Sequence, residues 1–251
     1  MRKLTISLLL TIIAATTTYA QVGEYRSELA FGVNAGATMT TVNFQPKVPQ
    51  DQFIGKTAGL TLRYTGEKYF NSICAIVAEL NMAEMGWKES ILTPEDQPVM
   101  RVDADEPERY ERKLTYLQVP VFARLGWGRE RQGFQFFFQV GPQVGFLQKE
   151  QTTKNFEIAN RNSYDRTSQI IAQDTMDVEN RMDYGIAAGL GLEFSHRKVG
   201  HFLLEGRYYY GLGNLYGNSK RDYFAISNMQ SIVIKLSYLF DISRTKNSKI
   251  K

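Results

Sequence analysis

The sequence has 251 residues, enough for one domain of ordinary size. Thirty Lys and Arg against 26 Asp and Glu give a formal net charge of +4, too small an excess to indicate binding of nucleic acid. Cys74 is the only cysteine, so an exported form of the chain gains no internal disulfide, and a small apolar residue on a strand is the simpler interpretation of it.

The first twenty residues have the three parts of an export signal. Arg2 and Lys3 form a positive start, and the apolar run Leu4–Ala15 is too short to cross a bilayer as a helix. Thr18–Ala20 then offers residues that a signal peptidase accepts, and no cysteine follows that would indicate a lipoprotein. We predict that residues 1–20 are a signal peptide cleaved before Gln21; a retained N-terminal anchor is the alternative.

Beyond this segment, apolar and polar residues alternate with a period of two, which is typical of pleated strands with chemically different faces. The range 133–147 shows the pattern best, with Phe134, Phe136 and Phe138 on one face and Gln135 and Gln139 on the other. We predict eight strands, near Glu28–Thr38, Lys56–Thr65, Ser72–Trp87, Lys113–Trp127, Gly133–Leu147, Met182–Ser195, His201–Leu212 and Asn228–Phe240.

A period of two occurs both in membrane barrels and in soluble β-sandwiches. Three features favour the barrel. The polar face is rich in glycine, as at Gly185, Gly189 and Gly191, which suits a narrow lumen and gives no benefit on a wetted surface. Aromatic residues such as Trp127 and Tyr208 gather near strand ends, and the connections alternate between short and long. Outer-membrane barrels combine short periplasmic turns with long extracellular loops.

The fold class predicted is therefore all-β, an eight-stranded antiparallel transmembrane β-barrel in a bacterial outer membrane. We assign residues 21–240 to the barrel domain and 241–251 to a basic periplasmic tail. Outer-membrane lipid is then the first partner of the chain.

Four segments of the sequence carry a family resemblance. They read YLQVPV at 116–121, QVGPQVG at 139–145, YGIAAGLGLEF at 184–194 and LEGRYYYGL at 204–212. In this order they resemble the PorT-like outer-membrane β-barrel family. The resemblance implies an eight-stranded barrel of unassigned biochemical activity, and the family's namesake is an accessory of the type IX secretion system. The chain departs from the common barrel ending, because Phe240 is followed by eleven further residues.

The same alternation predicts a lumen charge network. Its members are Glu28, Arg63, Glu79, Arg124, Glu193, Glu205, Arg207 and Lys235. Four charges of each sign indicate mutual pairing, because an unpaired buried charge is very costly and an eight-stranded barrel is only wide enough to be filled by side chains. Counting through the last hairpin sets Glu205 opposite Lys235. A proton or ion path, or carboxylates for acid–base chemistry, is the alternative interpretation.

Signatures of an enzyme are weak. Ser195 and His196 are adjacent, so on a strand they point to opposite faces and do not form a nucleophile–base pair. His201 falls with His196 at a predicted periplasmic turn. The acidic residues of the range 148–181 lack the spacing of metal ligands. We therefore predict no catalytic residue, no metal site and no cofactor.

Charge differs between the two predicted sides. The range 88–112 has eight acidic and four basic residues, whereas the short turns and tail together have nine basic and three acidic residues. A basic periplasmic rim suits a cell-wall polymer or an acidic envelope partner, although ordinary solubility and orientation are the simpler explanation. The sequence thus favours a non-enzymatic scaffold or interaction module, with a secretion accessory as one form of it. A narrow pore for small solutes is the alternative, and a surface enzyme is third.

Overall fold

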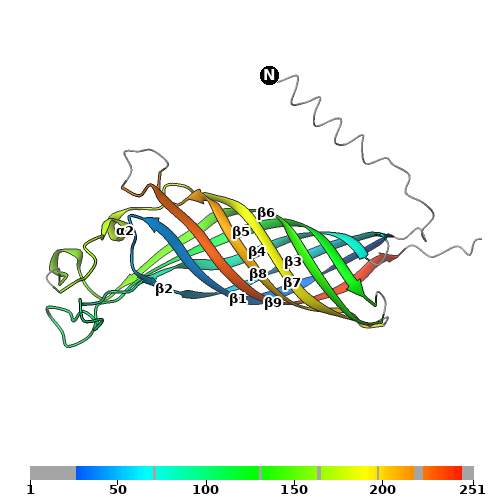
Figure 1. Ribbon diagram of the computed structural model, residues 1–251, viewed down its shortest axis with the longest axis horizontal. Helices are drawn as coiled ribbons and strands as arrows, with labels where there is room; N and C mark the ends of the chain where they lie inside the picture. The colour runs from blue at the N-terminus through cyan, green and yellow to red at the C-terminus, as the bar shows by residue number, and fades with distance from the viewer. Residues whose placement is uncertain are drawn as a thin grey trace, which may run out of the picture.

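The computed structural model of the protein describes residues 27–69, 72–129, 132–162, 165–196, 198–217 and 223–244. It is a tall barrel whose long loops project from one end, while both ends of the described chain meet at the other (Figure 1). The signal peptide predicted at 1–20 lies outside the described residues.

Eight long antiparallel strands form the wall. They are β1 (Glu28–Gln45), β3 (Phe53–Tyr69), β4 (Ser72–Glu89), β5 (Tyr110–Gly128), β6 (Gly133–Lys154), β7 (Met182–His196), β8 (Gly200–Asn214) and β9 (Ile226–Arg244). Each pairs with its neighbours in the order β4-β3-β1-β9-β8-β7-β6-β5, and the pairing of β4 with β5 closes the ring. The two-residue strand β2 (Gln50–Asp51) extends the sheet beside the outer end of β4. Closure leaves the long strands without a free edge, so their backbone groups are paired within the wall.

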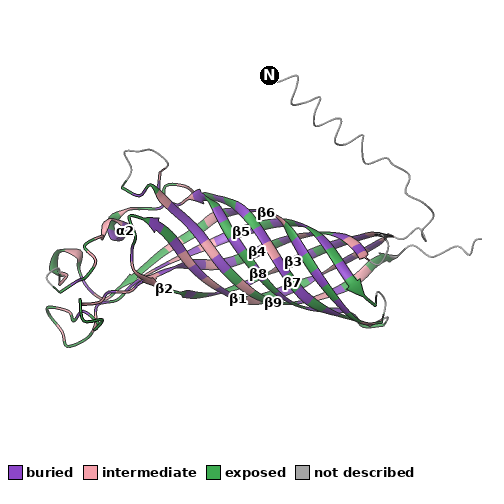
Figure 2. Cartoon of the chain, in the orientation of Figure 1, coloured by how far each residue is buried: buried purple, intermediate pink, exposed green. Residues whose placement is uncertain are grey.

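Burial follows the period of two along most of each long strand, and Figure 2 shows it as alternating stripes. On β7 the residues of one parity, such as Glu193, are buried and those of the other, such as Leu190 and Leu192, are about half exposed. The exposed side chains are apolar and cover the outside of the barrel. The buried side chains are mostly polar and fill the lumen. This inverted arrangement, apolar outside and polar inside, is that of a barrel surrounded by lipid.

The eight strands predicted from the sequence are present, and most extend beyond the predicted bounds at the long-loop end. β1 continues to Gln45 and β6 to Lys154, so much of the ranges 39–55 and 148–154 is strand rather than loop. β9 continues to Arg244, so its first four residues beyond Phe240 belong to the wall, where Leu29 pairs with Ser243. These extensions stay ordered because each pairs with an equally long neighbour, which a single-strand pattern does not reveal.

The long connections carry only short helices, a 3-10 turn (Ile158–Asn160) and α2 (Ala172–Thr175), between β6 and β7. Among the described residues no helix has the length and apolar character needed to span a membrane. The barrel wall therefore positions the charged residues of the lumen.

Candidate functional site in the barrel lumen

The centre of the lumen is occupied by four mutually bonded charged groups. The Arg207 guanidinium donates to both oxygens of Glu79, at 3.0 and 3.1 Å, and its Nε donates to Glu205 Oε1 at 2.8 Å. The Lys235 ammonium lies 2.5 Å from Glu79 Oε1 and 3.5 Å from Glu205 Oε2. All four side chains are at least 95% buried. Two carboxylates and two cations thus neutralise one another in a space without bulk water.

A second charged group lies nearer the short-turn end. Glu193 accepts from Arg63 Nη1 at 2.8 Å on each carboxylate oxygen and also from Arg124. The Arg124 guanidinium stacks on the Phe137 ring, 3.7 Å from its centroid. Glu28 lines the small cavity beside this group, together with Arg63 and Arg124. One carboxylate therefore holds two guanidinium groups, and an aromatic face contacts the second.

Glycines on the inner face leave the space that these large groups fill. A Cβ on Gly191 would approach the Phe137 ring to 2.5 Å, and one on Gly189 would approach Glu205 Oε1 to 3.0 Å. The glycine-rich polar face of the sequence thus has a steric cause in the lumen.

His201, the second residue of β8, is bonded to this second charged group. Its Nδ1 is 2.7 Å from Glu193 Oε1 and 2.8 Å from the Ser195 hydroxyl, and its Nε2 is 3.2 Å from both carboxylate oxygens of Asp241. The Ser195 hydroxyl itself donates to Glu193 Oε1 at 3.0 Å and is fully buried. A serine, histidine and aspartate are therefore connected, but the serine is bonded to a carboxylate and has no exposed face to offer a substrate.

At the long-loop end the lumen is filled by aromatic rings. Phe44 packs on Trp87, Tyr216 and Phe224 with ring centroids 5.4, 6.3 and 4.8 Å apart, and all four side chains are buried. Arg112 donates to the Tyr216 hydroxyl at 2.8 Å and lies over the Trp87 ring. A hydrophobic and aromatic cluster thus lies above the charged groups.

The connection between β6 and β7 is fastened above this cluster by Arg166. Its guanidinium donates to Glu108 Oε2 at 2.9 Å and to Glu89 Oε1 at 3.3 Å, and it lies 5.2 Å from the centroid of Phe156. We call these residues, Glu89, Glu108, Phe156 and Arg166, the outer-loop latch. All three charged side chains are almost fully buried.

Burial also raises the pKa of two carboxyl groups at the long-loop end, which lie beyond the apolar band: Glu89 at the end of β4 and Asp174 in α2. The pKa of Glu89 is raised to about 7, mainly because the carboxyl is buried and also because the charge of Asp174 is nearby. The positive charge of Arg166 opposes this rise. Burial raises the pKa of Asp174 to about 6. Both oxygens of Asp174 and Oε2 of Glu89 have no hydrogen-bond partner among the described residues. These two groups therefore take up protons near neutral pH.

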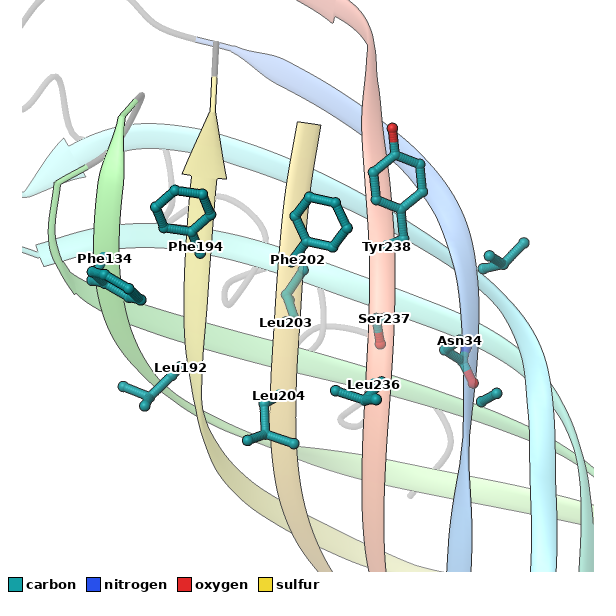
Figure 3. Close-up of a pocket in the computed structure, with 12 residues that line it drawn as sticks. Asn34, Phe134, Leu192, Phe194, Phe202, Leu203, Leu204, Leu236, Ser237 and Tyr238 are labelled. Carbon is teal, nitrogen blue, oxygen red and sulfur yellow. The ribbon is translucent and has the colours of Figure 1, made fainter. Parts of the chain in front are cut away.

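A wide depression lies on the outside of the wall, across β6, β7, β8, β9 and β1. An upper row of rings from Phe134, Phe194, Phe202 and Tyr238 stands above a row of leucines, and Figure 3 shows these side chains on the outer face. The rings pair at 5.0 Å, Phe134 with Phe194 and Phe202 with Tyr238. Its lining is almost entirely apolar and it faces away from the lumen, so lipid covers it.

The sequence matches the model of a known protein family. A family model described as "Outer membrane protein beta-barrel domain" matches residues 19–217, which is most of the chain. The chain belongs to this family. It is an outer-membrane β-barrel protein, and its place is the bacterial outer membrane. The match ends before β9, the last strand, which pairs with β1 and β8.

Several solved outer-membrane barrels are similar to this one over most of its length. Ail of Yersinia pestis is 12% identical, with 85% of this chain and 99% of Ail covered and a TM-score of 0.35. Neisserial surface protein A is 8% identical, with 85% and 99% covered and a TM-score of 0.41. The outer membrane enzyme PagL is 8% identical, with 82% and 98% covered and a TM-score of 0.35. No curated protein is significantly similar in sequence. Similarities this low assign neither an activity nor a ligand to the barrel.

The structure places all eight predicted network residues in the lumen. It brings seven together in the two charged groups and puts Glu28 at the edge of the second. β8 and β9 pair Glu205 with Lys235, as the hairpin count predicts, but the shorter contact of Lys235 is to Glu79. Sequence reasoning assigned His201 to a turn and did not connect it with Asp241. The parity of β8 and β9 carries that signal, because both residues share the inward face with Glu205 and Lys235.

Proposed function

We propose that this outer-membrane barrel is a non-enzymatic, non-conducting scaffold or interaction module. The observation that carries the proposal is the filled lumen. Ion pairs cross it at two levels, and the aromatic cluster fills its outer part. A path for a hydrated solute would have to break several buried ion pairs, each of which is costly to separate.

The ends of the barrel are then the surfaces available for partners. At the outer end the latch holds a long connection in one position, which presents a defined surface. At the short-turn end the basic residues predicted from the sequence suit an acidic envelope partner. An accessory role in secretion, and membership of the PorT-like group within the family, rest on the sequence resemblance.

Two other functions have less support. The narrow pore requires a continuous aqueous path, and the cavity that Arg63, Arg124 and Glu193 border is small and lies at the short-turn end. A surface enzyme requires a reactive group at an accessible face. The Ser195 hydroxyl, the one nucleophile that contacts a histidine among the described residues, is fully buried.

Conductance across planar lipid bilayers tests the proposal. We expect the reconstituted protein to give no discrete conductance steps, while heat-shifted electrophoretic migration shows that it is folded. The positive control is the triple variant Arg63→Ala with Arg207→Ala and Trp87→Ala. It removes the two arginines whose ion pairs cross the lumen and one ring of the aromatic cluster, so it should conduct more than the natural chain. Regular conductance steps from the natural chain would establish the pore instead.

A further inference from the structure

Among the side chains that the structure describes, the outward-facing charges in the outer half of the wall are confined to one side of the barrel. In the outer half of the wall, the outward-facing charges on long strands are Lys56 on β3, Glu84 and Lys88 on β4, Glu111 and Lys113 on β5, and Lys149 on β6. These four strands are consecutive in the ring. On the outer halves of β1, β7, β8 and β9, the described outward-facing side chains carry no charge and include Tyr184, Tyr208 and Tyr210.

Strand register brings the lower of these residues into one belt. Glu84 pairs with Thr115, and Thr115 pairs with Lys149. Thr57 pairs with Ala83, so Lys56 and Glu84 follow one step further out on their strands. Lys113 reaches this row by its ion pair with Glu84, 3.2 Å between Nζ and Oε1. We call Lys56, Glu84, Lys113 and Lys149 the lysine belt; it has three ammonium groups and one carboxylate.

Residues above the belt do not supply the missing negative charge. Lys88 is paired with Glu111 at 3.1 Å between Nζ and Oε2. Asp51 on β2 is in strand register with this Lys88 and not with Lys56. Neither Lys56 nor Lys149 forms an ion pair with a residue that the structure describes, although both are exposed. The belt therefore has two cations whose counter-ions are not part of the described chain.

The position of the belt indicates what those counter-ions are. Exposed apolar side chains lie on its membrane side: Leu60 on β3, Met82 below Glu84 on β4, and Phe146 below Lys149 on β6. The belt thus lies where the apolar band ends. A cation on the lipid face is costly at the bilayer midplane and costs little near the interface, so these lysines extend to the headgroup level. Negatively charged headgroups attract such side chains.

We propose that the lysine belt binds the phosphate group of an outer-leaflet lipid headgroup. Lys56 and Lys149 supply the two free ammonium groups, on either side of the pair formed by Glu84 and Lys113. Because the belt occupies one half of the circumference, bound lipid would gather on the β3–β6 side and leave the tyrosine-bearing side to neutral contacts.

Native mass spectrometry of the full mature protein, released from detergent, tests this inference. The probes are phosphatidic acid, which has a phosphate monoester, and phosphatidylcholine with the same acyl chains. The test variant is Lys56→Gln with Lys149→Gln. The matched control is Lys47→Gln with Lys154→Gln, which removes the same charge from exposed loop-end positions outside the belt. Heat-shifted migration verifies that all three proteins are folded.

Each lysine near a headgroup contributes about a fivefold preference, so the test variant should bind phosphatidic acid about 25-fold more weakly than the natural chain. Binding of phosphatidylcholine should not change, and the control variant should behave as the natural chain does. Equal binding of phosphatidic acid by test variant and natural chain would overturn the proposal. So would an equal loss in the control, which would indicate general charge attraction. Displacement of the lipid by an equal concentration of inorganic phosphate would indicate a site for free anions instead.

Discussion

Arg207 on β8 and Glu79 on β4 form a bidentate ion pair across the lumen, with nitrogen–oxygen distances of 3.0 and 3.1 Å. β8 and β4 are four strands apart in a ring of eight, so the pair joins opposite walls. Arg63 on β3 and Glu193 on β7 have the same relationship at 2.8 Å. Backbone hydrogen bonds connect only adjacent strands. These side chains are therefore the direct connections across the barrel's diameter.

The first prediction concerns Lys235, whose ammonium group contacts both Glu79 and Glu205. Lys235→Met leaves Glu79 with less compensation, and we expect a loss of about 3–5 kcal/mol in the free energy of unfolding. Adding Glu79→Gln should recover much of that loss, because Arg207 then remains paired with Glu205. Adding Glu205→Gln instead should recover less, since the Lys235 contact to Glu205 is longer, 3.5 Å against 2.5 Å. Urea unfolding in lipid vesicles, analysed as two double-mutant cycles, measures both couplings. Zero coupling in both cycles would mean that these side chains do not meet.

The outer-loop latch gives a prediction about local opening. Arg166→Met leaves Glu89 and Glu108 buried without their common partner, so the range 155–181 should open far more often. Hydrogen exchange, followed by mass spectrometry, should show faster exchange there with unchanged exchange in the barrel wall. Arg161→Met, on the same connection but outside the latch, is the control. Uniform acceleration across the whole barrel would contradict a local role.

The raised pKa values of Glu89 and Asp174 predict a pH dependence for the same connection. When the loop is packed, these carboxyls hold protons up to about pH 7 and about pH 6, and when it opens they return to ordinary values near 4.5 and 3.8. The packed form therefore binds more protons in this window, and its stability falls as the pH rises from about 4 to 7. Hydrogen exchange, corrected for the intrinsic effect of pH, should show less opening at pH 5.5 than at pH 8. In Glu89→Gln with Asp174→Asn, the dependence should disappear.

Orientation in the membrane is open to a direct test. Protease added to intact cells should cut within the ranges 88–112 or 148–181 and spare the turn at 128–132 and the tail at 245–251. Because the outer-loop latch holds the range 148–181 in place, protease should cut this range more slowly than it cuts an exposed loop. Cutting of this range should be faster in Arg166→Met than in the natural chain. Cleavage of the tail alone in intact cells would reverse the topology.

Removal of the signal segment remains a prediction from the sequence. Mass spectrometry of the protein isolated from cells should give a chain that begins at or within a residue or two of Gln21. A mature chain that still contains Met1 would show that the segment is retained as an anchor.

The sequence by itself determined the strands and their inner and outer faces. A strand has a period of two, so each residue's face follows from its position, and the inward placement of Glu79, Arg124 and Arg207 could be predicted. The pairing of Glu205 with Lys235 could also be predicted, because a hairpin fixes the register between two neighbouring strands.

Only the tertiary structure decided which residues meet across the barrel. Glu79 and Arg207 are 128 positions apart in sequence, and their contact depends on strand number, tilt and closure of the ring, none of which a single strand encodes. The same holds for His201, which meets Asp241 through the pairing of β8 with β9. It also holds for Arg166, whose partners are Glu89 at the end of β4 and Glu108 in the connection that follows it. Local periodicity assigns a side chain to a face. Its partners are set by long-range packing of the whole ring.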